Sequence, residues 1–188
     1  AIDSLVLDKI RHLPGVLLVS ETLEEIAFFE YDGSQDFGVL KGVDDQFARV
    51  NNVDSTLREG NYQLKIADRN GAVLGAGVRN KLSVNVNDPV ATMTVYMPTS
   101  GESGGALSKP FKSRLIYPTG TFAIQQDYDN QYVLTNLAFV RDLLDVPDGT
   151  VSALEIKCRS KGDVPNAKRA IRDLLGDAFV VRDDREQN

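Results

Sequence analysis

The order of helical and strand-like segments is the feature that most constrains the fold of this chain. Helical and strand-like patterns are mixed near both chain ends, whereas residues 51–131 consist almost entirely of short strand-like segments separated by turns. Grouped strands and helices are typical of α+β folds rather than of a regular β-α-β alternation. The sequence therefore predicts an α+β fold. We expect residues 1–50 and 132–188 to form one α/β subdomain and residues 51–131 to form an inserted β-rich subdomain.

Two helices near the chain ends have clear signals. Residues 4–13 place Leu5, Ile10 and Leu13 roughly on one helical face, and a Pro-Gly pair follows them. Residues 165–175 begin with a proline and end before Gly176, as helices often do. We expect this second helix to pack Ile171, Leu174 and Leu175 onto a sheet that contains the strand at 151–158.

Strand-like runs and glycine turns make up most of the remaining signal. Residues 16–23 and 25–31 read as two strands, and Asp32-Gly33 closes the second with a tight turn. A further turn is expected at Asn70-Gly71, and a last strand is expected at 178–183. The pair Gly75 and Gly77 follows a strand and precedes a helix, but Asn80 stands where a dinucleotide-binding loop has its third glycine. Close backbone packing is the better interpretation of these glycines.

Charge and rare residue types exclude several classes of function. The 188 residues carry 21 Lys and Arg against 27 Asp and Glu, a formal net charge of -6. Phosphate contact requires clustered Lys and Arg, and no basic stripe is present, so we expect no nucleic-acid partner. The single histidine, His12, and the single cysteine, Cys158, form no catalytic set. The acidic run Asp127–Asn130 lacks the spacing of a calcium loop. We expect no enzymatic activity, no metal and no cofactor.

The order of several longer motifs resembles a known family. "LKGVDDQF", "LREG", "VLGAGVRNKLSVNVNDPVATM", "PTGTFAIQQDYDNQYVLTNLAFVRDLL" and "VSALEIKC" follow one another from about residue 39 to residue 182. This order is similar to the extracytoplasmic domain of ABC transporter permeases of the MacB/FtsX superfamily, and the closest type is the LolC/LolE permease of lipoprotein-releasing systems. Asn87 stands where the family often has a glycine, and Arg79 replaces a small residue.

The resemblance implies a discontinuous architecture and a non-catalytic role. Residues 1–50 and 132–188 would be a porter-like α/β subdomain, and residues 51–131 an inserted, β-rich, sabre-like subdomain. The domain would lie between the first and second membrane helices of the permease, at the inner membrane of a Gram-negative bacterium and facing the periplasm. A chain that begins without Met and ends in charged "RDDREQN" is consistent with such a fragment.

The implied partners are proteins. They are a lipoprotein substrate, a periplasmic carrier protein, a second permease copy or paralogue, and a cytoplasmic ATPase subunit that acts through membrane helices outside this chain. Alternatives stay open: a MacB-like efflux permease, an FtsX-like signalling permease, or a stand-alone enzyme or ligand-binding domain.

The stretch "MPTSGESGGALSKPFK" carries the partner-docking hypothesis. In LolC-type permeases the matching interval is a projecting hairpin that docks the carrier. Apolar side chains in such a loop can anchor a partner, and basic ones can steer an acidic partner. The candidate partner-binding residues are Leu107, Lys109, Pro110, Phe111, Lys112 and Arg114. The alternative is a plain loop, with Phe111 and Leu115 tucked into the core.

Overall fold

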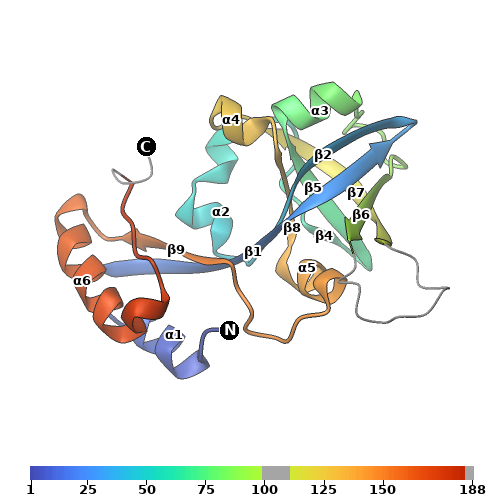
Figure 1. The fold of residues 1–188 in the computed structure, drawn as a ribbon. Helices are drawn as coiled ribbons and strands as arrows, with labels where there is room; N and C mark the ends of the chain where they lie inside the picture. The colour runs from blue at the N-terminus through green and yellow to red at the C-terminus, as the bar shows by residue number, and fades with distance from the viewer. Residues whose placement is uncertain (99–110, 185–188) are drawn as a thin grey trace, which may run out of the picture.

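The computed structural model describes residues 1–98 and 111–184 as a mixed α/β fold dominated by one sheet (Figure 1). The strands are β1 (Val16–Tyr31), β2 (Ser34–Val43), β3 (Leu57–Gly60), β4 (Lys65–Ile66), β5 (Arg69–Gly75), β6 (Met93–Pro98), β7 (Phe111–Phe122), β8 (Tyr132–Asn136) and β9 (Ala153–Cys158). The helices are α1 (Ser4–Arg11), α2 (Phe47–Val50), α3 (Ala76–Leu82), α4 (Gln126–Asp129), α5 (Leu137–Leu144) and α6 (Val164–Leu175). Short 3-10 turns lie at Val53–Thr56, Lys161–Asp163 and Gly176–Ala178.

Strand β1 runs through the whole molecule, as Figure 1 shows. Its first half pairs with β9, from Val16↔Cys158 to Thr22↔Ala153. Its second half pairs with β2, from Thr22↔Val43 to Tyr31↔Ser34, and also with β6. The two strands expected at 16–23 and 25–31 are therefore one continuous strand. The hairpin turn at Asp32-Gly33 is confirmed, because both residues have positive φ angles, 47° and 82°.

The second half of β1 belongs to a closed ring of strands. The ring follows the order β7, β6, β1, β2, β8, β5, in which each strand is hydrogen-bonded to the next. It closes because β5 also pairs with β7. The interior of the ring is filled by the largest hydrophobic cluster, which includes Phe29, Leu40, Leu74, Met93 and Val133. Helices α3 and α5 contribute to the same cluster through Leu82 and Val140.

A second cluster holds the two chain ends together. Its buried part includes Ile10 of α1, Val19 of β1, and Ala167 and Ile171 of α6, and Ile156 of β9 packs against it. The expected packing of the C-terminal helix onto the 151–158 strand is confirmed, since Leu174 and Leu175 also contact this cluster. Pro165 lies in the first turn of α6 and Gly176 is its C-cap, with φ 66°.

A third cluster covers one outer flank of the ring. Its buried members are Val43 of β2, Phe47 of α2, Val53, Val73 of β5, Phe122 of β7 and Leu134 of β8. The segment between β3 and β4 contributes Tyr62 and Leu64, and α4 contributes Tyr128. The short link after β2 therefore acts as a cover for this flank.

These clusters divide the chain along a different line from the predicted boundaries. Strand β2, strand β8 and helix α5 were assigned to the terminal subdomain, yet they pack with the ring. The cluster at the chain ends is built from α1, the start of β1, β9 and α6. The assignment of porter-like and sabre-like subdomains stays a prediction.

Three local expectations are wrong. Leu5 is 71% exposed, and α1 buries Leu7 and Ile10 instead. The turn expected at Asn70-Gly71 lies at residues 67–68, since Lys65 pairs with Asn70. Residues 179–184 form no strand.

The glycines at the start of α3 permit a close approach of α4. A Cβ atom on Gly75 would collide with the carbonyl oxygen of Asp129, and one on Gly77 with the side chain of Asn130. Close packing, the interpretation preferred from the sequence, is thus confirmed. Asp129 is held in place because its carboxylate accepts a hydrogen bond from Ile124 N at 2.8 Å.

We expect Gly75→Ala to destabilise the domain by about 1–3 kcal/mol, because the added methyl group meets backbone that cannot yield easily. Gly162→Ala is the matched control, since the nearest atom to its Cβ would be Ser160 Oγ at 3.7 Å. Urea unfolding of both variants measures the difference. Equal midpoints for Gly75→Ala and the parent protein would contradict the close approach.

Candidate partner-docking site

The candidate docking residues lie where β6 and β7 end beside each other. The antiparallel ladder between these strands runs from Met93↔Ile116 to Pro98↔Phe111. Leu107, Lys109 and Pro110 lie outside the described residues. Phe111, Lys112 and Arg114 are described, on the first residues of β7.

The described docking residues are accessible. The side chains of Phe111 and Leu115 are 50% and 52% exposed, so neither is tucked into the core as the plain-loop alternative required. Arg114 is exposed, and its guanidinium donates a hydrogen bond to the Ser113 carbonyl at 2.9 Å. Within residues 1–98 and 111–184, no ion pair involves Lys112 or Arg114. Their charges are therefore not neutralised by an ion pair within this part of the chain.

The strand alternation separates apolar from basic side chains. Lys112 and Arg114 share a face of β7 with buried Ile116, whereas Phe111 and Leu115 lie on the opposite face. The sequence analysis treats these residues as one partner-binding set. The structure instead presents an apolar side and a basic side of the same strand, and a partner that contacts both would have to reach around its edge.

A buried lysine forms a second polar feature, which the sequence analysis missed. Lys41 of β2 is 6% exposed, and its Nζ lies 3.5 Å from Glu155 of β9 and 3.9 Å from Glu24 of β1. The same Nζ lies 5.1 Å from the ring centroid of Phe47 and 5.6 Å from those of Tyr128 and Tyr132. The lysine therefore ties β9, from the chain-end cluster, to the ring.

The tyrosines around Lys41 stay protonated. Tyr128 and Tyr132 stack with centroids 3.8 Å apart, and the hydroxyl of Tyr132 donates to Glu24 at 3.2 Å. Burial, followed by the charge of Glu24, raises the pKa of Tyr132 to about 12. Burial also raises the pKa of Tyr128. Neutral phenols beside one cation and two carboxylates suit a structural junction rather than proton transfer near neutral pH.

Further polar contacts cross the same junction. The carboxylate of Asp44 accepts hydrogen bonds from Ser20 Oγ and Glu21 N, both at 2.8 Å. Glu21 lies 3.7 Å from Arg11 of α1 and 3.5 Å from Arg141 of α5. The junction between the chain-end cluster and the ring is thus linked by several charged pairs as well as by the continuous strand β1.

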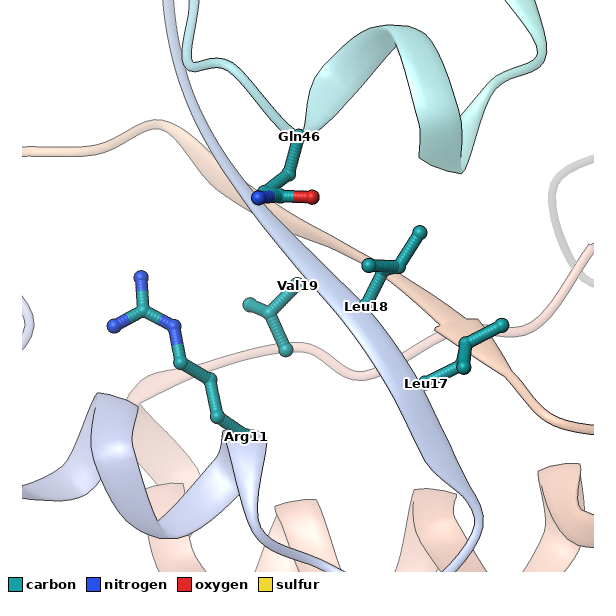
Figure 2. A pocket seen from close by; sticks show the side chains of 5 residues that line it. All are labelled: Arg11, Leu17, Leu18, Val19 and Gln46. Atoms are coloured by element: carbon teal, nitrogen blue, oxygen red, sulfur yellow. The ribbon is translucent and has the colours of Figure 1, made fainter.

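Two concave features lie on the described surface, one at the junction and one beside β7. Figure 2 shows a pocket on β1 at the junction, where Arg11 of α1 and Gln46 beside α2 lie on either side of Val19. Its volume of about 190 Å³ is below the range of typical ligand pockets. A groove of about 400 Å³ lies beside β7, where Arg69 stacks over Tyr117 at 4.8 Å.

His12 and Cys158, the single histidine and the single cysteine, were the other residues considered for chemistry. The imidazole of His12 is exposed and lies 3.5 Å from Asp8 one turn earlier. Burial, followed by Asp163, raises the pKa of the Cys158 thiol, so the thiolate is disfavoured. In the part of the chain that the structure describes, no group of three or more His, Cys, Asp or Glu is placed to hold a metal. No helix in that part is long and apolar enough to cross a bilayer.

Comparison with known proteins identifies the fold through solved structures. No protein-family model and no curated protein sequence matches the chain. The extracellular domain of the noncanonic ABC-type transporter YknZ from Gram-positive bacteria is similar over 97% of this chain and 89% of its own, with a TM-score of 0.61 and 11% identity.

Two further solved structures have a similar fold. The periplasmic region of MacB from Actinobacillus actinomycetemcomitans matches 93% of this chain and 73% of its own, with a TM-score of 0.62 and 12% identity. A domain of a protein described as a permease from Porphyromonas gingivalis matches 92% of this chain and 69% of its own, with a TM-score of 0.52 and 15% identity. The chain therefore has the fold of extracytoplasmic domains of ABC-type transporter permeases. The expected fold class is confirmed at this level.

Proposed function

We propose that this chain is the extracytoplasmic domain of an ABC transporter permease that transmits motion and docks partner proteins without catalysing a reaction. The fold match across nearly the whole chain to the YknZ and MacB domains is the observation that supports the proposal. In this arrangement a separate cytoplasmic ATPase subunit hydrolyses ATP, and membrane helices outside this chain connect it to the domain.

Lipoprotein release is the particular transport process that we propose. Its support is the ordered set of motifs that resembles LolC/LolE permeases, together with accessible Phe111 and two cations of β7 that form no ion pair among the described residues. The domain would face the periplasm at the inner membrane of a Gram-negative bacterium. It would act with a lipoprotein substrate, a periplasmic carrier, and a second permease copy or paralogue. Its subdomains would be porter-like and sabre-like.

Efflux by a MacB-like permease is the second candidate, because the MacB periplasmic region shares the fold. Depletion of the full-length protein distinguishes the two. Under the lipoprotein-release proposal, outer-membrane lipoproteins accumulate in the inner membrane, as density-gradient fractionation would show. Unchanged lipoprotein sorting, with increased sensitivity to exported compounds, would favour efflux. An FtsX-like signalling role predicts neither result and a defect in cell-wall cleavage instead.

Docking through the start of β7 gives a direct prediction. We expect Phe111→Ser to weaken binding of the purified periplasmic carrier at least tenfold, because a buried anchor contributes about 2 kcal/mol or more. Arg114→Glu should mainly slow association and reduce its salt dependence. Surface plasmon resonance on the immobilised domain measures both effects, and Leu107→Ser and Pro110→Ala test the remaining candidates in the full transporter.

Lys157→Glu is the matched control for the charge change, because Lys157 is exposed on β9, away from β7. Carrier binding should be unaffected in this variant. If Phe111→Ser and Arg114→Glu bind the carrier as the parent does while remaining folded, the start of β7 does not dock the carrier.

A further inference from the structure

The groove beside β7 is large enough to hold a small ligand. Its volume of about 400 Å³ lies within the range of typical ligand pockets, roughly 300–1,000 Å³. Four parts of the chain line it: the end of β3 with the residues that follow, the β4–β5 hairpin, the segment between α3 and β6, and β7. Its apolar part comes from buried Val86, Ala91 and Pro118 and from partly exposed Ile66. We call this feature the β7 groove.

Two side chains of opposite charge line the β7 groove, Arg69 of β5 and Asp88 before β6. In the described ranges 1–98 and 111–184 they form no ion pair with each other, and the Arg69 guanidinium has no hydrogen bond or other ion pair. The guanidinium stacks over the Tyr117 ring, 4.8 Å from its centroid. Stacking fixes the plane of the group and leaves its N–H edge open. That geometry suits bidentate binding of a carboxylate.

The Asp88 carboxylate is held in place but not neutralised. Its Oδ1 accepts a hydrogen bond from Val90 N at 3.0 Å, and the Asp88 carbonyl accepts one from Ala91 N at 3.1 Å. Among the residues that the structure describes, Oδ2 has no hydrogen-bond or ion-pair partner. A fixed carboxylate with an open oxygen suits an ammonium group. A ligand that satisfies both Arg69 and Asp88 therefore carries an anionic group and a cationic group.

Three side-chain amides complete the polar lining of the β7 groove. Asn61, Gln63 and Asn87 are all exposed. Within the part of the chain that the structure describes, none of their side-chain amides has a hydrogen-bond partner. An amide both donates and accepts hydrogen bonds, and a peptide bond has the same two functions. The three amides therefore match a ligand that contains peptide bonds between its charged ends.

We propose that the β7 groove binds a short peptide with free termini. The terminal carboxylate pairs with Arg69, the terminal ammonium pairs with Asp88, and the peptide bonds face the side-chain amides. An aliphatic side chain of the peptide contacts the apolar part of the groove. A single amino acid has both charges but no peptide bond, and an acidic sugar leaves Asp88 without a cation. The proposal goes beyond the permease function and does not rest on it.

Titration of the purified, ¹⁵N-labelled chain with the tripeptide Ala-Leu-Ala tests the site by NMR. The amide signals of Asn61, Asn87 and Thr119 should shift and saturate. The expected dissociation constant is roughly 100 μM, in keeping with the affinity per atom of a ligand of about 20 non-hydrogen atoms. The same peptide with an amidated carboxyl end, or with an acetylated amino end, should bind about tenfold more weakly, because each change removes one charge-assisted contact.

Two variants assign each end of the peptide to its side chain. Arg69→Gln should bind the free peptide about tenfold more weakly and should no longer distinguish it from the amidated form. Asp88→Asn should lose the distinction between the free and the acetylated forms, while its side-chain oxygen can still accept from Val90 N. Thermal unfolding should show that both variants are folded. Lys65→Gln is the matched control, since Lys65 is exposed on β4 but does not line the groove, and it should bind as the parent does.

Three outcomes would overturn the peptide site. One is a parent chain whose signals do not shift with several millimolar tripeptide. Another is binding that depends on both peptide ends in the same way in Arg69→Gln and Asp88→Asn as in the parent. The third is tighter binding of glucuronic acid than of the tripeptide, lost in Arg69→Gln, which would assign the groove to an acidic sugar. The titration involves no carrier, membrane or transport, so its failure leaves the proposed permease function standing.

Discussion

Ile171→Asp is expected to unfold the cluster that joins the two chain ends. Ile171 is 5% exposed on α6 and packs in the same cluster as Ile10 and Val19. The substitution removes a buried aliphatic side chain and leaves a carboxylate without a partner. Together these effects cost about 4 kcal/mol or more, a large part of the 5–15 kcal/mol that stabilises a typical domain. Urea unfolding followed by circular dichroism measures the loss.

Leu5→Asp is the matched control for this variant. It makes the same kind of change on a helix of the same cluster, but Leu5 is 71% exposed. We expect its free energy of unfolding to lie within about 0.5 kcal/mol of that of the parent, as for most surface substitutions. An Ile171→Asp variant that unfolds at the parent's midpoint would show that α6 does not pack as described.

Lys41→Glu is expected to have a comparable effect at the junction. The substitution places a third carboxylate beside Glu24 and Glu155 at a site where the Lys41 side chain is 8% exposed. It also removes the cation that faces three aromatic rings. We expect a loss of about 3–5 kcal/mol, the range observed when a buried pair loses one partner. Because Glu24 and Glu155 are about one-third exposed, added salt should recover part of this loss.

Two further variants separate the causes. Lys41→Met removes the cation without adding an anion, and we expect a smaller loss because the two glutamates can hydrate. Lys65→Glu makes the same charge change at an exposed lysine whose side chain contacts Asn70. It should leave the unfolding midpoint nearly unchanged. A Lys41→Glu midpoint equal to that of Lys65→Glu would show that the Lys41 contacts contribute little.

The sequence predicted those turns and helix ends that depend on the conformational preferences of one or two neighbouring residues. The Asp32-Gly33 turn was predictable because few residues other than glycine and Asn or Asp tolerate positive φ. The limits of α6 were predictable from Pro165 and Gly176. Gly71 was misassigned to a turn because glycine also serves close approach: its Cβ would collide with the carbonyl oxygen of Gln63.

The errors concern features that depend on distant residues. Phe179 and Val180 resemble a strand in composition, but they are exposed and pair with no strand among the described residues. The Lys41 site joins side chains from β1, β2, β8 and β9, and only a lysine between buried Leu40 and Gly42 hinted at it. Phe111 is accessible, but its role in docking stays a prediction. The separation of the candidate docking residues onto two faces required the register of β7.

The continuity of β1 has a mechanical consequence. Its 16 residues span at most roughly 50 Å at about 3.3 Å per residue, and the same strand is built into the chain-end cluster at one end and the ring at the other. Under the proposed function, such a strand would act as a lever arm. If its base tilts by about 10°, a tip roughly 50 Å away moves by roughly 9 Å. The Lys41 and Glu21 contacts hold this strand near its midpoint. Under the proposed motion-transmitting function, a small rotation beside α1 and α6 would produce a larger displacement at the hairpin between β1 and β2.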